Sequence, residues 1–411
     1  MIVERFKRFG VMSKPSSSVC NIDCDYCFYL EKENLYPERK KNWRMSDSTL
    51  EQYIRDFIES QPDQVIEFVW QGGEPTLLGI DFFQQAVEFQ QKYRGYKTIQ
   101  NSLQTNGTLL DEEWAHFFKQ NQFLIGLSID GDRVSNDAYR RTRKGKSTFD
   151  DVLKGVELLK KYGVEFNTLT VVNTENVKRP LHVYSFLKRI GSQYMQFIPL
   201  VERKSVKPDV DGLILVQPAY EGEANLANWS VPAKAYGKFL NTIFDHWLVN
   251  DLGKVFVMNF EQTMSQIAGR PGTCVHSETC GSALAMESNG DVYSCDHYVY
   301  SDHKLGNIHQ ASLIELVNLP QNRAFGQNKL DRISADCVGC EVRSLCHGGC
   351  PKHRFVKSSD GIRNKNYLCE GYKTHFGHIA PQMKSLLSLL QQGMPPKKIK
   401  QVFKKGIYSI E

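Results

Sequence analysis

The chain has 411 residues, which is enough for two domains or for one large barrel with an appendage. Hydrophobic residues make up 41% and charged residues 24%, and no apolar run approaches the length of a bilayer span, so a membrane-spanning protein is excluded. The 51 basic and 46 acidic residues leave a net charge of +5, which is too small to indicate a nucleic-acid partner.

The first ten residues carry scattered charges and lack the apolar stretch of a secretory signal, so we expect a cytoplasmic protein. In that compartment clustered cysteines bind metals more often than they form disulfides. Of eleven cysteines, three lie between residues 20 and 27 and eight between residues 274 and 369. One group of three and two groups of four account for all of them, which indicates one open and two closed metal clusters.

Between residues 14 and 201, β-branched or aromatic runs alternate with amphipathic segments, which predicts repeated βα units. The expected strands are Phe9–Met12, Val65–Trp70, Thr98–Gln104, Leu124–Ile129, Phe166–Val172 and Tyr194–Ile198. The expected helices are Leu50–Glu59, Phe82–Tyr93, Glu112–Lys119, Asp150–Tyr162 and Leu181–Arg189. Right-handed crossovers would curl these strands into a partial parallel (β/α)6 barrel, an α/β fold with functional loops at the carboxyl ends of the strands.

Three cysteines follow the first predicted strand, in the order Cys20-x3-Cys24-x2-Cys27. Three thiolates can hold three irons of a four-iron cluster, and the open fourth iron can bind and reductively cleave S-adenosylmethionine. Half of a zinc ribbon is the alternative, although zinc ribbons usually bring two Cys-x2-Cys pairs and fill all four positions. No fourth cysteine follows before Cys274, but three ligands alone leave both alternatives open.

Polar and glycine-rich loops follow the next three predicted strands. The run Gln71-Gly72-Gly73-Glu74 follows the second strand, where glycines permit close backbone approach to a ligand and a carboxylate suits an ammonium group. Residues 104–107 and 128–131 end the third and fourth strands at the same rim of the barrel. Each loop taken alone is also ordinary turn chemistry.

Residues 202–231 are rich in Pro, Asn and Gly, which predicts an irregular surface connector that could touch substrate. Helices are expected at 232–250 and 376–390, and the basic tail 397–405 is explained by a solvated helix face. The expected domains are a barrel at 1–231, a helical connector at 232–272, a smaller cysteine-rich C-terminal domain at 273–371, and a C-terminal helix with a basic tail at 372–411.

The later cysteines follow the order Cys274-x5-Cys280-x14-Cys295, then Cys337-x2-Cys340-x5-Cys346-x3-Cys350, then Cys369. Eight thiolates would fill two four-iron clusters completely, and closed clusters transfer electrons. Two structural zinc sites with interleaved cysteines are the alternative. Asp296 adjoins Cys295, so its carboxylate is fixed beside a metal ligand, where it either accepts a proton from substrate or only supports the ligand.

Together these segments resemble the anaerobic sulfatase-maturating enzymes, a family of radical S-adenosylmethionine (SAM) enzymes. The resemblance is carried by the runs CNIDCDYCFYLEK, WQGGEPTL, QTNG, CDHY and CHGGCPKHR, and it extends over nearly the whole chain. It implies a barrel of the radical SAM type, a C-terminal domain of the SPASM type that carries two auxiliary clusters, and three [4Fe-4S] clusters with S-adenosyl-L-methionine as cofactors.

The resemblance also implies cofactor ligands. Cys20, Cys24 and Cys27 would hold the open cluster. The auxiliary clusters would be held by Cys274, Cys280, Cys295 and Cys350, and by Cys337, Cys340, Cys346 and Cys369. The methionine amino group would meet Gly73 and Glu74, the methionine carboxylate Ser128 and Arg140, and the nucleoside end Tyr26 and Val201. Arg141 and Arg143 are alternatives to Arg140.

For the reaction, the resemblance implies that Asp296 is the catalytic base and that Gln71 and Tyr29 line the peptide site. A radical formed from S-adenosylmethionine would remove a β-hydrogen from a cysteine or serine of a sulfatase polypeptide, in a Cys/Ser-x-Pro-x-Arg type motif. An auxiliary cluster would accept the second electron, and the product would be formylglycine. An external donor such as flavodoxin or ferredoxin would supply the first electron, and neither nucleic acid nor a membrane is an expected partner.

Two features depart from the family pattern. Asp132 stands where the family commonly has proline, and the segment 202–231 is longer than in typical members, which could alter the choice of peptide. Two other functions are weighed beside sulfatase maturation. One is a radical peptide maturase that forms thioether or carbon–carbon crosslinks, and the other is a non-catalytic zinc or iron–sulfur scaffold.

Overall fold

The computed structural model of the chain describes residues 8–36, 38, 41–208 and 212–405. The first seven residues, on which much of the signal-peptide expectation rests, lie outside the described residues. Every helix in the described part is too short or too polar to span a bilayer.

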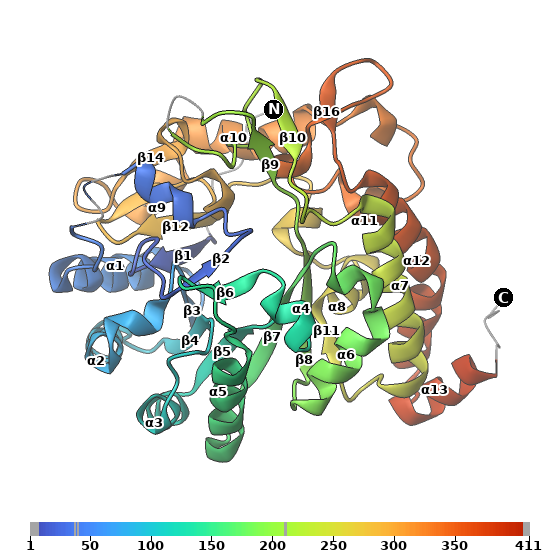
Figure 1. Ribbon diagram of the computed structural model, residues 1–411, viewed down its shortest axis with the longest axis horizontal. Helices are drawn as coiled ribbons and strands as arrows, with labels where there is room; N and C mark the ends of the chain where they lie inside the picture. Colours follow the sequence, from blue (N-terminus) through green and yellow to red (C-terminus); the bar gives the residue numbers. More distant parts are fainter. Residues whose placement is uncertain (1–7, 37, 39–40, 209–211, 406–411) are drawn as a thin grey trace.

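The centre of the molecule is a curved sheet of ten strands (Figure 1). Its middle consists of six parallel strands in the order β8-β7-β5-β4-β3-β1, which confirms the predicted partial (β/α)6 barrel. Their bounds are β1 (Gly10–Lys14), β3 (Val65–Trp70), β4 (Thr98–Thr105), β5 (Phe123–Ser128), β7 (Phe166–Val172) and β8 (Tyr194–Pro199). Each lies within two residues of its expected range.

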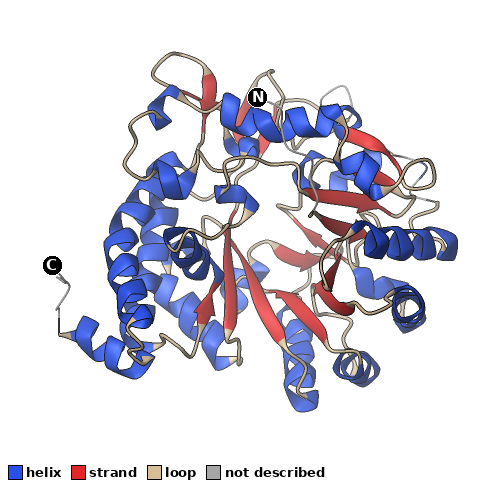
Figure 2. Cartoon of the chain, turned by 180° about the vertical axis from the view of Figure 1, so that it is seen from behind, coloured by secondary structure: helices blue, strands red, loops and turns tan. Residues whose placement is uncertain are grey.

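Helices that alternate with these strands cover the outer face of the sheet, as Figures 1 and 2 show from opposite sides. They are α1 (Asp47–Ser60), α2 (Ile80–Tyr93), α3 (Glu112–Gln120), α5 (Phe149–Tyr162) and α6 (Pro180–Arg189). In α1, Ser46 caps the first turn, and Leu50, Tyr53, Ile54 and Phe57 form the buried stripe that the helical period requires. These apolar stripes made the helices predictable.

Four short strands extend the sheet at its two edges: β11 (Phe256–Val257), β12 (Ala283–Glu287), β13 (Asp291–Tyr293) and β14 (Lys304–Asn307). The strand β12 runs parallel to β1 along its whole length, from the pair Gly10–Ala283 to the pair Lys14–Glu287. The cysteine-rich part of the chain therefore continues the barrel sheet next to the strand that precedes the first cysteine loop. The domain boundaries proposed from the sequence stay a prediction.

Outside the main sheet, β2 (Ile22–Cys24) pairs with β6 (Arg140–Thr142), and β15 (Val356–Lys357) pairs with β16 (Arg363–Lys365). The predicted irregular connector 202–231 contains a further pair, β9 (Arg203–Ser205) with β10 (Ala224–Leu226). There the buried guanidinium of Arg203 donates hydrogen bonds to the carbonyl oxygens of Gln217, Pro218 and Tyr220. The connector is thus partly ordered, because the buried Arg203 side chain binds several of its backbone carbonyl oxygens.

The C-terminal half contains α7 (Ala233–Asn250), α8 (Met258–Ile267), α9 (Leu313–Val317), α10 (Pro320–Asp331), α11 (Arg343–Cys346), α12 (Cys369–Gln391) and α13 (Pro396–Lys404). In Figure 1, α7 and α12 lie side by side, and theirs is the most extensive contact between two helices of the described residues. The basic tail forms α13, which buries Ile399 and Phe403, as a solvated amphipathic helix predicts.

Candidate functional site

The first cysteine loop rests on the glycine-rich loop after β3. The amide of Gly73 donates to the carbonyl oxygen of Ser17 at 2.7 Å, and that of Glu74 donates to Val19 at 2.9 Å. A Cβ atom on Gly73 would lie 2.0 Å from the Val19 oxygen, so only glycine fits. The close approach seen here is that of the cysteine loop, and the assignment of Gly73 to a bound ligand stays a prediction.

Burial raises the pKa of the Cys20 and Cys24 thiols to about 12, and it raises the pKa of Cys27 as well. Thiols that are costly to ionise alone are stabilised as thiolates when they bind metal cations, so this donor set fits a metal cluster. In the described residues, no three Cys, His, Asp or Glu side chains converge as closely as a single metal ion requires. Each thiolate of a four-iron cluster binds a different iron and needs a wider spacing than around zinc.

A buried polar chain adjoins these thiols. Strand pairing places Arg140 opposite Cys24, and the Nη1 of Arg140 donates to the Tyr26 hydroxyl at 3.1 Å. The Tyr26 hydroxyl donates to Asp130 Oδ2 at 2.7 Å, and the other oxygen of Asp130 accepts from the Val171 amide. The Nε of Arg140 is buried and has no hydrogen-bond partner among the described residues. It is therefore a charged donor that is available to an anionic ligand.

The neighbouring arginines of Arg140 point elsewhere. Arg141 is exposed and donates to the carbonyl oxygen of Asp137, while Arg143 is exposed and donates to that of Cys20 at 2.9 Å. Of the three arginines weighed from the sequence, only Arg140 is buried beside the thiols.

The Glu74 carboxylate is fully buried and accepts four hydrogen bonds. Its Oε1 accepts from the amide and hydroxyl of Thr76 and from the Thr105 hydroxyl, and its Oε2 accepts from the Asn106 amide at 2.7 Å. These bonds tie the loop after β3 to the loop after β4. The sequence interpretation missed this framework role, although a glutamate beside two glycines at a strand end is a signal for it.

The other predicted SAM contacts lie at the same rim. Ser128 ends β5, and its hydroxyl lies 3.5 Å from the amide nitrogen of Gln104. Val201 follows β8 and is buried in the main hydrophobic core, whereas its neighbour Leu200 packs in the cluster that contains Tyr26 and Trp229. The structure thus brings Ser128 to the rim and leaves the Val201 contact a prediction.

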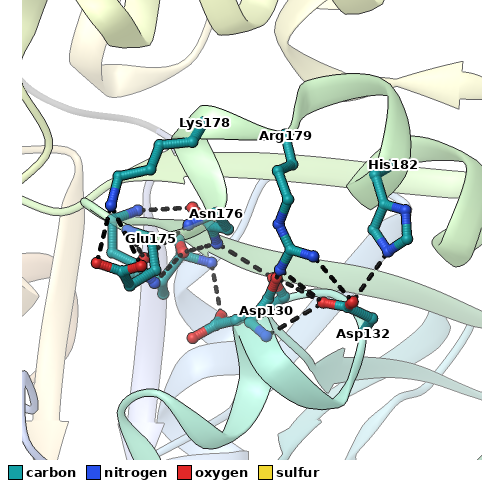
Figure 3. A network of polar contacts seen from close by, with 10 residues as sticks. Asp130, Asp132, Glu175, Asn176, Lys178, Arg179 and His182 are labelled. Carbon is teal, nitrogen blue, oxygen red and sulfur yellow. Dashed lines mark hydrogen bonds and ion pairs between the residues drawn. The ribbon is translucent and has the colours of Figure 1, made fainter.

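Figure 3 shows how the loop after β5 is supported. The side-chain amide of Asn176 donates to the carbonyl oxygens of Asp130 and Val171. Asp132, which departs from the family pattern, accepts hydrogen bonds from Arg179 and Ser135 and pairs with His182 at 2.9 Å. Burial alone would raise the pKa of Asp132, but these donors outweigh it and lower the pKa to about 2. Asp132 is thus a loop anchor in place of the proline.

A second group of residues meets between the barrel and the C-terminal part. Asp296 begins the short helix η6 (Asp296–Tyr298), and its Oδ1 lies 2.5 Å from the Nζ of Lys14. The same Nζ donates to Gln71 Oε1 at 2.5 Å and lies 3.9 Å from the centroid of the Tyr29 ring. All three residues predicted for the reaction therefore converge on Lys14, which the sequence analysis missed. A lysine that ends an otherwise buried strand was the available signal.

The electrostatic surroundings keep the Asp296 carboxylate ionised. Burial raises its pKa, but Lys14, His297 and Lys352 together outweigh burial and lower the pKa below its usual value. Nearby, the Tyr29 hydroxyl donates to Glu287, which also accepts from the Ser17 hydroxyl. A carboxylate in this state can accept a proton from a substrate group.

The eight later cysteines form two groups. Burial raises the pKa of Cys280, Cys295 and Cys350, and Cys274 raises each of them further. In the second group, burial together with Cys369, Cys337 and Cys340 raises the pKa of Cys346 to about 12. A small cavity is lined by all four thiols of this second group. The assignment of these thiols to two cluster ligand sets stays a prediction.

Comparisons with known proteins agree with these features. The pattern of the Radical SAM superfamily matches residues 15–187, and that of the SPASM iron-sulfur cluster-binding domain matches residues 274–341. The chain is 43% identical to a serine-type anaerobic sulfatase-maturating enzyme of Bacteroides thetaiotaomicron, over 98% of this chain and 97% of that protein. It is 36% identical to a cysteine-type enzyme of Clostridium perfringens, over 91% of this chain and 97% of the relative.

A solved structure, native anSMEcpe with bound AdoMet and Cp18Cys peptide, superposes with a TM-score of 0.80. It is 34% identical and covers 93% of this chain and 99% of its own. The structure of Streptococcus suis SuiB bound to its precursor peptide SuiA has a TM-score of 0.58 at 14% identity and therefore shows the shared fold alone.

Proposed function

This chain belongs to the anaerobic sulfatase-maturating enzymes of the radical SAM superfamily, and from this premise we propose how its own residues carry out the family's reaction. It is a radical SAM oxidoreductase that converts a cysteine or serine side chain of a sulfatase polypeptide to formylglycine. Three [4Fe-4S] clusters and S-adenosyl-L-methionine are its cofactors. Family membership confirms the resemblance seen in the sequence and disfavours both a crosslinking maturase and a non-catalytic scaffold.

One observation carries the assignment of the reaction site. Asp296 adjoins the cysteine ligand Cys295, and Lys14 connects its carboxylate to Gln71 and Tyr29 on the barrel rim. In this proposal, the target side chain enters beside these residues. Asp296 accepts the thiol or hydroxyl proton as the substrate loses two electrons, and Gln71 and Tyr29 line the peptide site.

The residues around the first cysteine loop fit a cluster and a bound amino-acid cofactor. Cys20, Cys24 and Cys27 are the proposed ligands of the open cluster, which together with S-adenosylmethionine supplies the hydrogen-atom abstraction. Arg140 is the proposed partner of the methionine carboxylate. The N–H group at its buried Nε has no acceptor among the described residues, and Ser128 lies at the same rim. Gly73 and Glu74 are assigned to the methionine amino group, and Tyr26 and Val201 to the nucleoside end.

The two later cysteine groups are the proposed ligand sets of the auxiliary clusters. Cys274, Cys280, Cys295 and Cys350 form one set, and Cys337, Cys340, Cys346 and Cys369 form the other. Four protein thiolates on each cluster leave no open iron, so both clusters serve electron transfer rather than cofactor binding. The mutual effects of the thiols on their pKa values support this division.

The substrate of the proposed site is a sulfatase segment of the Cys/Ser-x-Pro-x-Arg type. A cytoplasmic location, an external donor such as flavodoxin or ferredoxin, and the lack of nucleic-acid and membrane partners complete the proposal. The small net charge of +5 supports the lack of a nucleic-acid partner.

The test is a reaction of oxygen-free protein, reconstituted with iron and sulfide, with S-adenosylmethionine, a reductant and two synthetic peptides. One peptide carries Cys-x-Pro-x-Arg and the other carries serine in place of cysteine. We expect an aldehyde by mass spectrometry in at least one peptide, with loss of sulfur from the cysteine peptide. A crosslinked peptide, or unmodified peptides despite S-adenosylmethionine cleavage, would reject the assignment.

A further inference from the structure

We propose that Lys14 is the positioning residue of the peptide site: its ammonium group fixes the Asp296 carboxylate and turns the Gln71 amide so that its NH2 group faces the substrate. This inference rests on the proposed function, because it assigns a role relative to Asp296 and Gln71. It adds a residue that neither the motifs nor the family comparison identified.

The fold delivers Lys14 to this place. Lys14 ends β1, between β3 and β12 in the sheet, where Ser13 pairs with Trp70 and Lys14 pairs with Glu287. The amide of Gln71, the first residue after β3, donates to the Ser13 carbonyl at 2.8 Å. The neighbouring strands β3 and β12 therefore hold the end of β1, and the Lys14 side chain is 1% exposed.

The Lys14 ammonium group contacts two oxygen atoms, Asp296 Oδ1 and Gln71 Oε1, each at 2.5 Å. Among the described residues it has no further oxygen partner. Its remaining side faces the ring of Tyr29, 3.9 Å from the centroid, which is a cation–π contact. A buried ammonium group needs such partners, because desolvation without them is strongly unfavourable. Lys14 is thus satisfied by the side chains of the site itself.

The chemistry of the ammonium group fixes the orientation of Gln71. An ammonium group has three donors and no acceptor, so the carbonyl end of the amide must face Lys14. The NH2 end then points away from Lys14 and is available as a donor to an acceptor on the bound peptide. A substrate carbonyl or the sulfur or oxygen atom of the target side chain is the acceptor of the matching class.

The ion pair likewise fixes Asp296. The carboxylate belongs to the C-terminal part of the chain, whereas Gln71 and Tyr29 belong to the barrel, and Lys14 contacts all three. Misplacement of a reacting group by about 1 Å can lower a rate by roughly a hundredfold. The Lys14 contacts therefore set the distance between the base and the peptide-binding groups.

The decisive test compares Lys14→Met, Lys14→Arg and Lys188→Met in the reconstituted protein. Lys188 is the matched control, because it is also ion-paired, to Asp251 at 2.7 Å, and belongs to α6, which is not part of the site. Formylglycine and 5′-deoxyadenosine are both measured, together with iron content and absorption spectra. For Lys14→Met we expect roughly a hundredfold lower ratio of formylglycine to 5′-deoxyadenosine at normal iron content. Lys14→Arg should restore part of the ratio, and Lys188→Met should match the wild type.

A second variant, Gln71→Glu, keeps an oxygen toward Lys14 but removes the NH2 donor. Its KM for the peptide should rise roughly tenfold, with little change in iron content, because a buried acceptor on the substrate loses its partner. A wild-type product ratio in Lys14→Met, or a wild-type KM in Gln71→Glu, overturns the inference. Wild-type protein that forms no formylglycine at all contradicts the proposed function instead, so the two failures are distinguishable.

Discussion

The two cysteine-bearing regions of this molecule are supported in opposite ways. Around the first cysteine loop, the buried cations Lys14 and Arg140 contact side chains of the candidate site. Lys14 is held by β1 of the main sheet, and Arg140 is held by the antiparallel pair of β2 and β6. Around the later cysteines, Lys329 and Arg354 donate to backbone carbonyl oxygens, such as those of Cys274 and Gly348. In the barrel these cations contact side chains of the candidate site, whereas in the C-terminal part they hold irregular backbone in place.

This difference implies different dependence on metal. Two of the later cysteines lie in the short elements η5 (Cys274–His276) and η8 (Ala335–Cys337), which contain no buried residue. The barrel, in contrast, packs aromatic rings such as those of Tyr53, Phe57, Phe68 and Trp70 against one another. We infer that the C-terminal part depends on its clusters for stability, whereas the barrel needs its cluster for the reaction and not for stability.

The largest effect is expected from removal of iron with a chelator. Structural metal sites contribute on the order of 10 kcal/mol to folding, so residues 274–280 and 335–369 should lose amide protection in hydrogen exchange. The barrel strands β3, β4, β5, β7 and β8 should stay protected, because they contain no metal ligand. A Cys20→Ala variant serves as control and should keep the C-terminal protection. Equal loss of protection in both regions would contradict the comparison.

The helix α7 packs against the barrel helix α6 and against α12, which begins at Cys369, so the contact between α7 and α12 joins the two regions and gives the next largest effect. A Cβ atom on Gly371 would lie 2.1 Å from the carbonyl oxygen of Ala233, and backbone atoms there cannot yield. Gly371→Ala should lower the free energy of unfolding by about 3 kcal/mol through overpacking. Gly377→Ala, on the same helix with nothing within 4 Å, should raise it by about 0.5–1 kcal/mol. Similar unfolding midpoints for the two variants would show that this contact does not join the regions.

A buried histidine in the same contact gives a smaller, pH-dependent effect. Burial, with His276 and His378, lowers the pKa of His375 to about 3, and its Nδ1 contacts Asn241 at 2.8 Å. Below pH 6.5, His375 binds a proton in the unfolded chain but stays neutral in the folded chain. The free energy of unfolding therefore falls as the pH falls towards 3. Between pH 6.5 and 5 the loss is about 2 kcal/mol. His375→Gln should flatten this part of the stability curve, and an unchanged slope would contradict the assignment.

The regular part of the fold was predictable from the sequence because it obeys simple periods. The stripe of α1 and the alternation along β3 bury apolar side chains at fixed intervals, so the expected range of β3 agrees to the residue and that of α1 to within three residues. The strands β12 to β14 escaped prediction, because three to five residues in a cysteine-rich segment show no period of their own. Tertiary contacts decide their pairing, in which β12 joins β1, β13 joins β12 and β14 joins β13.

The candidate site could be predicted where the spacing of residues indicates their chemistry, as it does for the cysteine groups and for the polar residues that follow the strands. Lys14 escaped because a single lysine has no pattern, and its role depends on contacts with Gln71 and Asp296, 57 and 282 positions away along the chain. Glu74 was recognised, but its four hydrogen bonds to neighbouring loops were not, since the sequence shows the donor types without their geometry.

The central claim is that the barrel cleaves S-adenosylmethionine while a carboxylate from the C-terminal part completes the oxidation of a sulfatase side chain. The most direct measurement is formylglycine and 5′-deoxyadenosine formation by Asp296→Asn with a normal complement of iron. The account predicts that 5′-deoxyadenosine still forms while formylglycine falls by about two to four orders of magnitude, the usual range for loss of a general base. Formylglycine formation at the wild-type rate would contradict it.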